Sequence, residues 1–193
     1  MKKNLLFAAM AVTALASCSN DDVVDVNNGG GISFRASLDR AVTRTNVTSL
    51  QNLAAFNVTA IGDGKNYFTD LGVSSADNGV NWTTASTYYW PGYELAFFAY
   101  APQAPAGTVS IDNASKKITG FSPAQAVADQ KDLVISYNTG TKAVNEGPGV
   151  AMNFKHALSQ IEVKAKCSND KIKIEIMGVK LVNAAAKAEF AFP

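Results

Sequence analysis

The chain has few of the residues on which enzyme and metal chemistry usually depends. It contains one histidine, His156, and two cysteines, Cys18 and Cys167, among 193 residues. No Cys-x-x-Cys or His-x-x-x-His pair is present, so neither a zinc-binding pattern nor a histidine-centred triad can be recognised. We predict a packing or hydrogen-bonding role for His156, no cofactor and no metal, and a protein that is not an enzyme. A small hydrolase built on two converging carboxylates stays open as an alternative.

Neither sign of charge dominates the composition. Lys and Arg together number 17 and Asp and Glu 16, which gives a formal net charge of +1. This balance gives no reason to expect nucleic acid as a partner. Beyond the N-terminus, no apolar run approaches the ~20 residues that a membrane-spanning helix needs. The length suits one domain with a substantial core, or at most two small ones.

The first 18 residues have the organisation of a bacterial lipoprotein signal peptide. Lys2 and Lys3 precede an apolar run from Leu5 to Ala16, and about a dozen residues is the length of a signal-peptide core. Leu15-Ala16-Ser17-Cys18 resembles a lipobox, so we predict a signal peptide over residues 1–17 and lipidation, by palmitate-type acyl chains, at Cys18. Several acyl chains anchor a protein stably. An ordinary secretory signal with an incidental cysteine is the alternative.

Residues 18–31 are predicted to be a tether. They contain three aspartates and three glycines and too little apolar surface to pack. Acidic residues soon after a lipidated cysteine resemble the signal that sends lipoproteins to the cell surface in Bacteroidetes-type bacteria, and a plain solvated linker is the alternative. With Cys18 lipidated, no intramolecular disulfide is possible. We expect the remaining thiol, Cys167, to be buried or at the end of a strand.

From residue 32 onward, apolar and polar residues alternate with the period of a half-buried strand. Turn signals such as Gly62-Asp63-Gly64 and Asp112-Asn113 separate the runs, and we expect turns there rather than calcium loops. Short strands at this spacing predict an all-β fold, an antiparallel β-sandwich with Greek-key connections, over residues 32–193. The predicted strands lie at residues 32–38, 56–60, 93–100, 109–111, 118–121, 133–137, 161–166 and 171–176, with one more starting near 190–192.

Aromatic residues are densest between residues 82 and 93, beside Pro91-Gly92. Their position at strand ends predicts that they close the end of the sandwich core. Stacking against sugar rings is the alternative. The residues are Trp82, Tyr88, Tyr89, Trp90 and Tyr93.

Several segments follow one another in an order that is shared with a known family. They are Ile32-x-Phe34 before Thr43-Arg44-Thr45, Phe56-x-Val58-x-Ala60, Tyr88-Tyr89-Trp90-Pro91-Gly92 before Leu95 to Pro102, Gln130 to Val134, and Phe154-Lys-His-Ala-Leu-Ser-Gln-Ile-Glu-Val163. With the lipobox and the acidic tether, this set resembles the fimbrillin (Mfa-like) family, the pilus subunits and related surface lipoproteins of Bacteroides and Porphyromonas relatives.

The resemblance implies a transthyretin-like sandwich and a place at the outer membrane or cell surface, in a fimbrium. It implies other fimbrial subunits as partners and a lipid anchor in the outer membrane. The alternative is a surface lipoprotein that does not polymerise and binds host protein or glycan. Fimbrillins usually have two sandwich domains, and this sequence stops at Pro193, so we expect the C-terminal domain to be absent or truncated.

All three arginines lie in the first predicted strand or in the connection after it, at Arg35, Arg40 and Arg44. In fimbrillins, an arginine-specific protease can cut this connection, and the first strand then leaves a groove that a neighbour's strand fills. By resemblance, Arg44 is the first candidate for cleavage and Arg40 the second, whereas ordinary solvent-facing arginines are the alternative. The predicted apolar anchors of the departing strand are Ile32, Phe34, Ala36 and Leu38.

Overall fold

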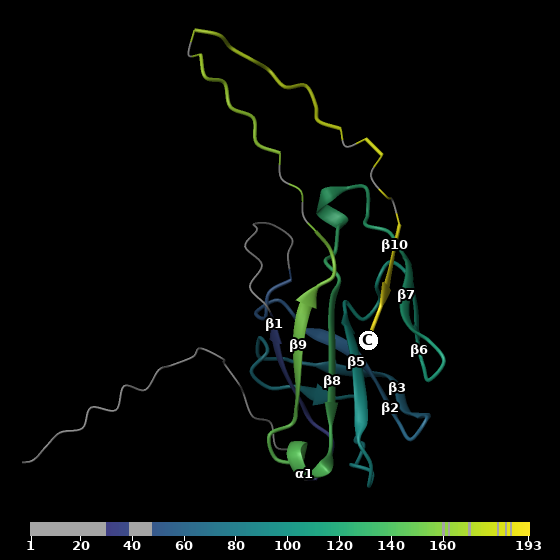
Figure 1. Ribbon diagram of the computed structural model, residues 1–193. Coiled ribbons are helices and arrows are strands. Elements are labelled where there is room, and N and C mark those ends of the chain that lie inside the picture. The colour runs from purple at the N-terminus through teal and green to yellow at the C-terminus, as the bar shows by residue number, and fades with distance from the viewer. Residues whose placement is uncertain are drawn as a thin grey trace, which may run out of the picture.

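The computed structural model describes residues 30–38, 48–159, 161, 163–169, 171–180, 182–183, 185 and 187–193. Nearly all of the regular structure is β, in two sheets, which confirms the predicted all-β sandwich (Figure 1). The predicted signal peptide, Cys18, most of the tether, Arg40 and Arg44 lie outside the described residues. Within the described residues, no helix is both long and apolar enough to cross a membrane.

The larger sheet has seven strands in the order β1-β9-β8-β5-β2-β3-β4. Neighbouring strands within this sheet are antiparallel, except that β1 runs parallel to β9. The connection from β5 to β8, its neighbour in this sheet, passes through the smaller sheet. The strands are β1 (Phe34–Leu38), β2 (Ala55–Gly62), β3 (Lys65–Ser74), β4 (Thr83–Thr84), β5 (Leu95–Ala101), β8 (Val134–Gly140) and β9 (Val150–His156).

The smaller sheet is antiparallel, with the order β10-β7-β6. Its strands are β6 (Thr108–Ile111), β7 (Lys116–Phe121) and β10 (Ala188–Ala191), and β6 and β7 form the hairpin expected around Asp112. A 3-10 helix, η1 (Val127–Asp129), precedes β8, and a single helical turn, α1 (Lys142–Asn145), joins β8 to β9.

The larger sheet is so strongly curved that strands far apart in its order enclose a common core. Four steps separate β1 from β2, which is about 19 Å in a flat sheet. Yet the rings of Phe34 on β1 and Phe56 on β2 are 6.3 Å apart between centroids. The first core cluster therefore lies inside the curve. Its largest members include Phe34, Phe56, Phe97, Phe154 and Trp82.

The second core cluster lies between β5 and the smaller sheet. On β5, Leu95, Phe97 and Ala99 face the first cluster, whereas Phe98 and Tyr100 belong to the second. Ile118 of β7 and Phe192, just after β10, complete the second cluster from the opposite side. Because both faces of β5 are buried, this strand lies between the two core clusters and separates them.

The strands predicted at 161–166 and 171–176 are wrong. We call residues 161–187 the arm. Its described residues form no strand and project from the body (Figure 1). Ile161 and Ile174 are each 65% exposed. The alternation is present in the sequence, but no described strand lies alongside to supply a ladder of hydrogen bonds or to cover the apolar side chains.

Candidate functional site

β1 is an edge strand that depends on a single neighbour. It pairs with β9 from Phe34 beside Val150 to Leu38 beside Phe154. Among the described residues, no strand pairs with its other edge. Just before β1, the Ile32 backbone N–H donates to the Tyr88 carbonyl at 2.7 Å, and Gly31 forms an isolated bridge with Tyr89. An edge strand of this kind is a template for exchange with another chain.

The apolar side chains of this segment enter the first core cluster. Ile32 is 5% exposed, Phe34 1% and Ala36 7%, and the half-buried Leu38 packs against the same cluster. The Phe34 ring meets Phe97 edge-on at 5.7 Å between centroids, in addition to its contact with Phe56. The core is therefore incomplete without this segment. That these four residues serve in strand exchange stays a prediction.

A glycine lets the segment approach β9 closely. The Val150 N–H donates to the Ser33 carbonyl at 2.9 Å, and Gly149 just before it has a φ of +75°. A Cβ at Gly149 would lie 3.0 Å from the Ser33 Oγ and 3.2 Å from the Ser33 carbonyl oxygen. The absence of a side chain at Gly149 therefore allows the segment before β1 to lie against β9.

The polar side of β1 carries Arg35 and Ser37. The Ser37 hydroxyl donates to the Asn153 Oδ1 on β9 at 2.6 Å. Arg35 is half-buried, and its Nε is enclosed with no hydrogen-bond partner among the described residues. Arg35 lies inside a paired strand, beside Ala151 of β9. Arg40 and Arg44 belong to the connection 39–47, whose structure is not described.

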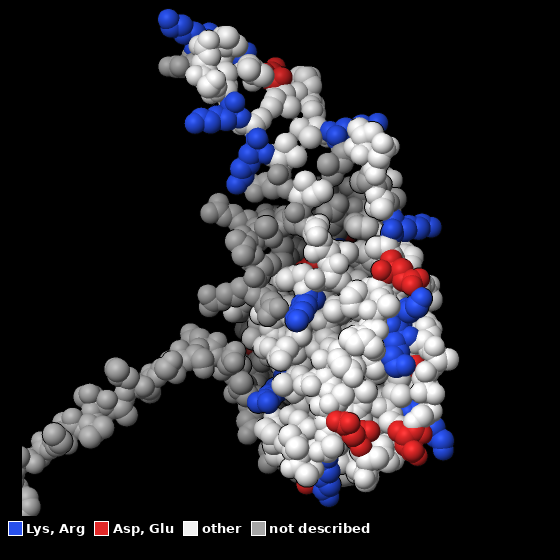
Figure 2. Space-filling view, viewed as in Figure 1, with Lys and Arg blue, Asp and Glu red and all other residues white. Residues whose placement is uncertain are grey.

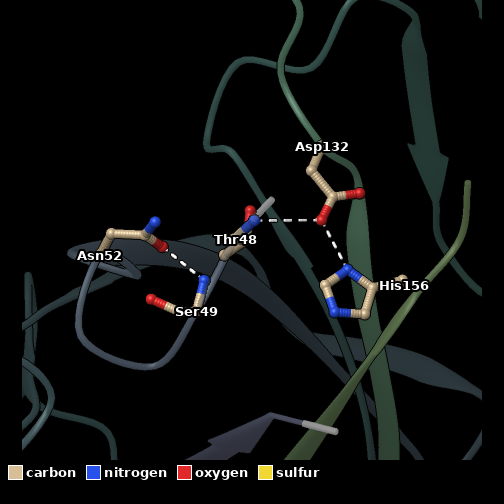
Figure 3. A network of polar contacts seen from close by, with 5 residues as sticks. All are labelled: Thr48, Ser49, Asn52, Asp132 and His156. Carbon is tan, nitrogen blue, oxygen red and sulfur yellow. Dashed lines mark hydrogen bonds and ion pairs between the residues drawn. The ribbon is translucent and has the colours of Figure 1, made fainter. Parts of the chain in front are cut away.

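A half-buried aspartate, Asp132, and the single histidine fix Thr48, the residue that follows that connection. The Asp132 Oδ2 lies 2.5 Å from the His156 Nδ1 and accepts the Thr48 backbone N–H at 3.2 Å, as Figure 3 shows. The side chains of His156 and Asp132 are 17% and 11% exposed. The predicted hydrogen-bonding role of His156 is thus confirmed. The pair joins the end of β9 to the start of β8 and fixes the first described residue after the connection.

A second polar network, which the sequence did not suggest, lies between β2, β3 and β5. The Tyr100 hydroxyl donates to Asp70, and the Asn57 side-chain amide donates to the same carboxylate at 2.9 Å. Gln103 donates to the Asn57 Oδ1 at 2.8 Å. Burial, together with the hydrogen bond to Asp70, raises the pKa of Tyr100 above its ordinary value. The groups satisfy one another, so we interpret the network as structural.

The predicted aromatic group divides into two parts. Trp82 and Trp90 are 2% and 9% exposed and belong to the first core cluster, so they close it as predicted. Tyr89 and Tyr93 are exposed instead. Tyr89 is nevertheless tied to the fold, because its carbonyl accepts the Tyr67 hydroxyl at 2.5 Å.

The remaining candidate residues are a thiol on the arm and an aspartate in a turn. Cys167 is exposed on the arm rather than buried or at a strand end, because no strand forms there. The Asp112 Oδ1 accepts the N–H groups of Ala114 and Ser115, both at 2.7 Å, and so closes the expected turn. Among the described residues, no group of three His, Cys, Asp or Glu side chains is placed to hold a metal ion.

Comparison with known proteins identifies a family for the chain. A model of the fimbrillin-like family matches residues 40–193, which is most of the chain. Among solved structures, a fimbrial protein from Bacteroides ovatus is similar over 66% of this chain and 28% of its own length, at 16% identity and a TM-score of 0.35. No curated protein matches. On the strength of the family match, the chain belongs to the fimbrillin-like family.

Proposed function

We propose that the protein is a subunit or accessory component of a fimbrium that is exported as a lipoprotein and assembles by donor-strand exchange. The observation that carries this proposal is the position of β1. It is an edge strand that pairs with β9 alone among the described strands and supplies apolar side chains to the first core cluster. If β1 leaves, β9 presents unpaired donors and acceptors beside emptied apolar pockets. Another extended strand with the same alternation can then fill the groove.

The energetics explain why a covalent cut is needed. Burying a large apolar side chain contributes ~1.5–3 kcal/mol. The burial of Ile32, just before β1, and of Phe34 therefore stabilises this segment in its groove by several kcal/mol. While β1 stays linked to Thr48 through residues 39–47, it rebinds within its own molecule at an effective concentration in about the millimolar range. Cleavage at Arg40 or Arg44 removes that link, and β1 then competes with donor strands only as a separate segment.

Lipidation at Cys18 and residence at the outer membrane belong to the same proposal. They are supported by the lipobox and the acidic tether of the sequence. The test is partition of the exported protein, before any cut at Arg40 or Arg44, into a detergent phase. We expect the native protein in the detergent phase and the Cys18→Ala variant in the aqueous phase. A Cys18→Ala variant that stays in the detergent phase would contradict lipidation at this residue.

An arginine-specific protease tests the exchange itself. We expect one discrete cut within residues 39–47, followed by loss of β1 and formation of oligomers. The double variant Arg40→Lys and Arg44→Lys is the matched control, because it keeps both charges and removes both sites. It should stay intact and monomeric. The proposal fails if the wild-type protein is not cut there, or if the cut protein keeps β1 and stays monomeric.

A further inference from the structure

The chain just before β1 pairs with a segment other than β9. We call that segment, residues 85–90, the strap. The Ile32 N–H donates to the Tyr88 carbonyl at 2.7 Å, and the glycine before it forms an isolated antiparallel bridge with Tyr89. From Ser33 onward the partner is β9, whose first residue donates its N–H to the Ser33 carbonyl at 2.9 Å. The chain therefore changes partner between Ile32 and Ser33.

The strap is fixed to β3 and to the first core cluster. Its Tyr89 carbonyl accepts the Tyr67 hydroxyl of β3 at 2.5 Å. The ring of Tyr88 lies 4.7 Å from that of Phe68, between centroids, and Trp90 is buried in the cluster. Since β1 and β3 lie near opposite ends of the sheet order, the segment that leads into β1 joins the two sides of the curved sheet.

Hydrogen bonds and apolar contacts, rather than charge, hold the strap. Within the described part of the chain, the ion pairs lie elsewhere. Figure 2 shows charged side chains of both signs in small groups, with no single-sign patch among the described residues on the face of the body in view. The Tyr67 ring is half-buried and packs against the first core cluster, so the fold positions its hydroxyl. Replacing Tyr67 by phenylalanine therefore removes one hydrogen bond and leaves the ring in place.

A cut within residues 39–47 frees the end of β1 that lies farthest from the strap. Leu38 at that end is half-buried, whereas Ile32 beside the strap is 5% exposed. Opening begins where few apolar contacts hold the chain, so β1 separates from β9 first at Leu38. The pairing with the strap is then the last contact to break.

We propose that the strap sets how long residues 30–38 stay bound after the cut, and that Tyr67 is the residue that positions it. The inference rests on the proposed function, since it concerns the departure of β1. The Tyr67 hydroxyl fixes the Tyr89 carbonyl and so keeps the carbonyl before it within reach of the Ile32 N–H. Because Cys18 leaves with residues 30–38, the strap also sets how long the cut protein stays joined to its proposed lipid anchor.

Amide exchange in the uncut, exported protein tests the strap without any cleavage. Tyr67→Phe removes the hydroxyl of the strap contact, and Tyr137→Phe removes a hydroxyl from β8, at a position that is 41% exposed, as the matched control. Exchange at the Ile32 N–H measures opening of the strap. Exchange at the Val150 N–H, which donates to the Ser33 carbonyl, measures opening of the pairing with β9.

We expect Tyr67→Phe to speed exchange at Ile32 by about twofold to tenfold, which corresponds to the net contribution of one hydrogen bond. Exchange at Val150 should stay as in wild type, and Tyr137→Phe should change neither rate. Equal acceleration at Ile32 and Val150 would mean that the hydroxyl supports the fold as a whole, and would overturn the assignment of Tyr67. Unchanged exchange at Ile32 would overturn it as well.

Release is then measured after cutting with the arginine-specific protease. Gel filtration and mass spectrometry at timed intervals give the fraction of the protein that still carries residues 30–38. We expect Tyr67→Phe to lose this segment faster than wild type, by the factor found at Ile32, and Tyr137→Phe to lose it at the wild-type rate. Equal rates in Tyr67→Phe and wild type would overturn the role of the strap and leave the proposed function standing. If the segment never leaves the cut wild-type protein or either variant, the proposed function itself fails.

Discussion

Replacing Phe34 by alanine should detach β1 while the rest of the fold stays intact. Phe34 is 1% exposed, and its ring contacts Phe56 and Phe97 inside the first core cluster. Truncating a buried phenylalanine costs about 3–5 kcal/mol, partly in lost transfer energy and partly in the cavity that remains. Because Phe34 is on an edge strand with one neighbour, we expect most of this cost to appear as easier opening of β1.

The rate of proteolytic cleavage at Arg35 measures how often β1 opens. A protease cannot reach a bond inside a paired strand until the strand detaches. We therefore place the variant in the background Arg40→Lys and Arg44→Lys, where Arg35 is the single arginine. When opening is fast relative to cleavage, the rate follows the open population. A cost of 3–5 kcal/mol then raises cleavage at Arg35 by about 150- to 5,000-fold, at tenfold per 1.36 kcal/mol.

Phe98→Ala is the matched control for this experiment. Phe98 is 2% exposed, but it belongs to the second cluster, where its ring meets Phe192 edge-on and Tyr137 at a tilt. We expect this variant to lose similar stability in chemical denaturation, with less than a tenfold change in cleavage at Arg35. If both variants accelerate cleavage equally, and by the factor that global unfolding predicts, then β1 does not detach as a unit and the reasoning is refuted.

Three further predictions use other contacts. Gly149→Ala should raise cleavage at Arg35 in the same assay, because a left-handed alanine costs about 1–3 kcal/mol and its Cβ would crowd Ser33. Asp132→Asn should lower the free energy of unfolding by about 1–3 kcal/mol and speed amide exchange at Thr48; unchanged exchange there would contradict the role of the carboxylate. The pKa of Tyr100 is raised in the folded protein, so the native state keeps this proton above pH 10 while the unfolded state loses it. Stability should therefore fall as pH rises above 10, as measured by urea denaturation, and Tyr100→Phe should reduce that fall.

β9 was not predicted, although Val150, Met152 and Phe154 alternate there with less buried residues. Uninterrupted alternation did predict several other strands. β2 and the hairpin of β6 and β7 are examples, and the turn at Asp63-Gly64 has the positive φ values of a two-residue hairpin. β3 was missed because its period breaks at Asp70, which has a φ of 55° where the register with β2 shifts. A bulge moves side chains to the other face, and a rule based on a period of two then fails.

The arm shows the opposite error, since the alternation there is clear and no strand forms. Period-two alternation indicates that a segment has an apolar side, but it does not show whether a neighbouring strand covers that side. The pairing of β1 with β9 was equally beyond the sequence, because the two strands lie 116 residues apart at Ser37 and Asn153. The hydrogen-bonding role of His156 could be predicted, but its partner Asp132 depends on where the ends of β8 and β9 meet.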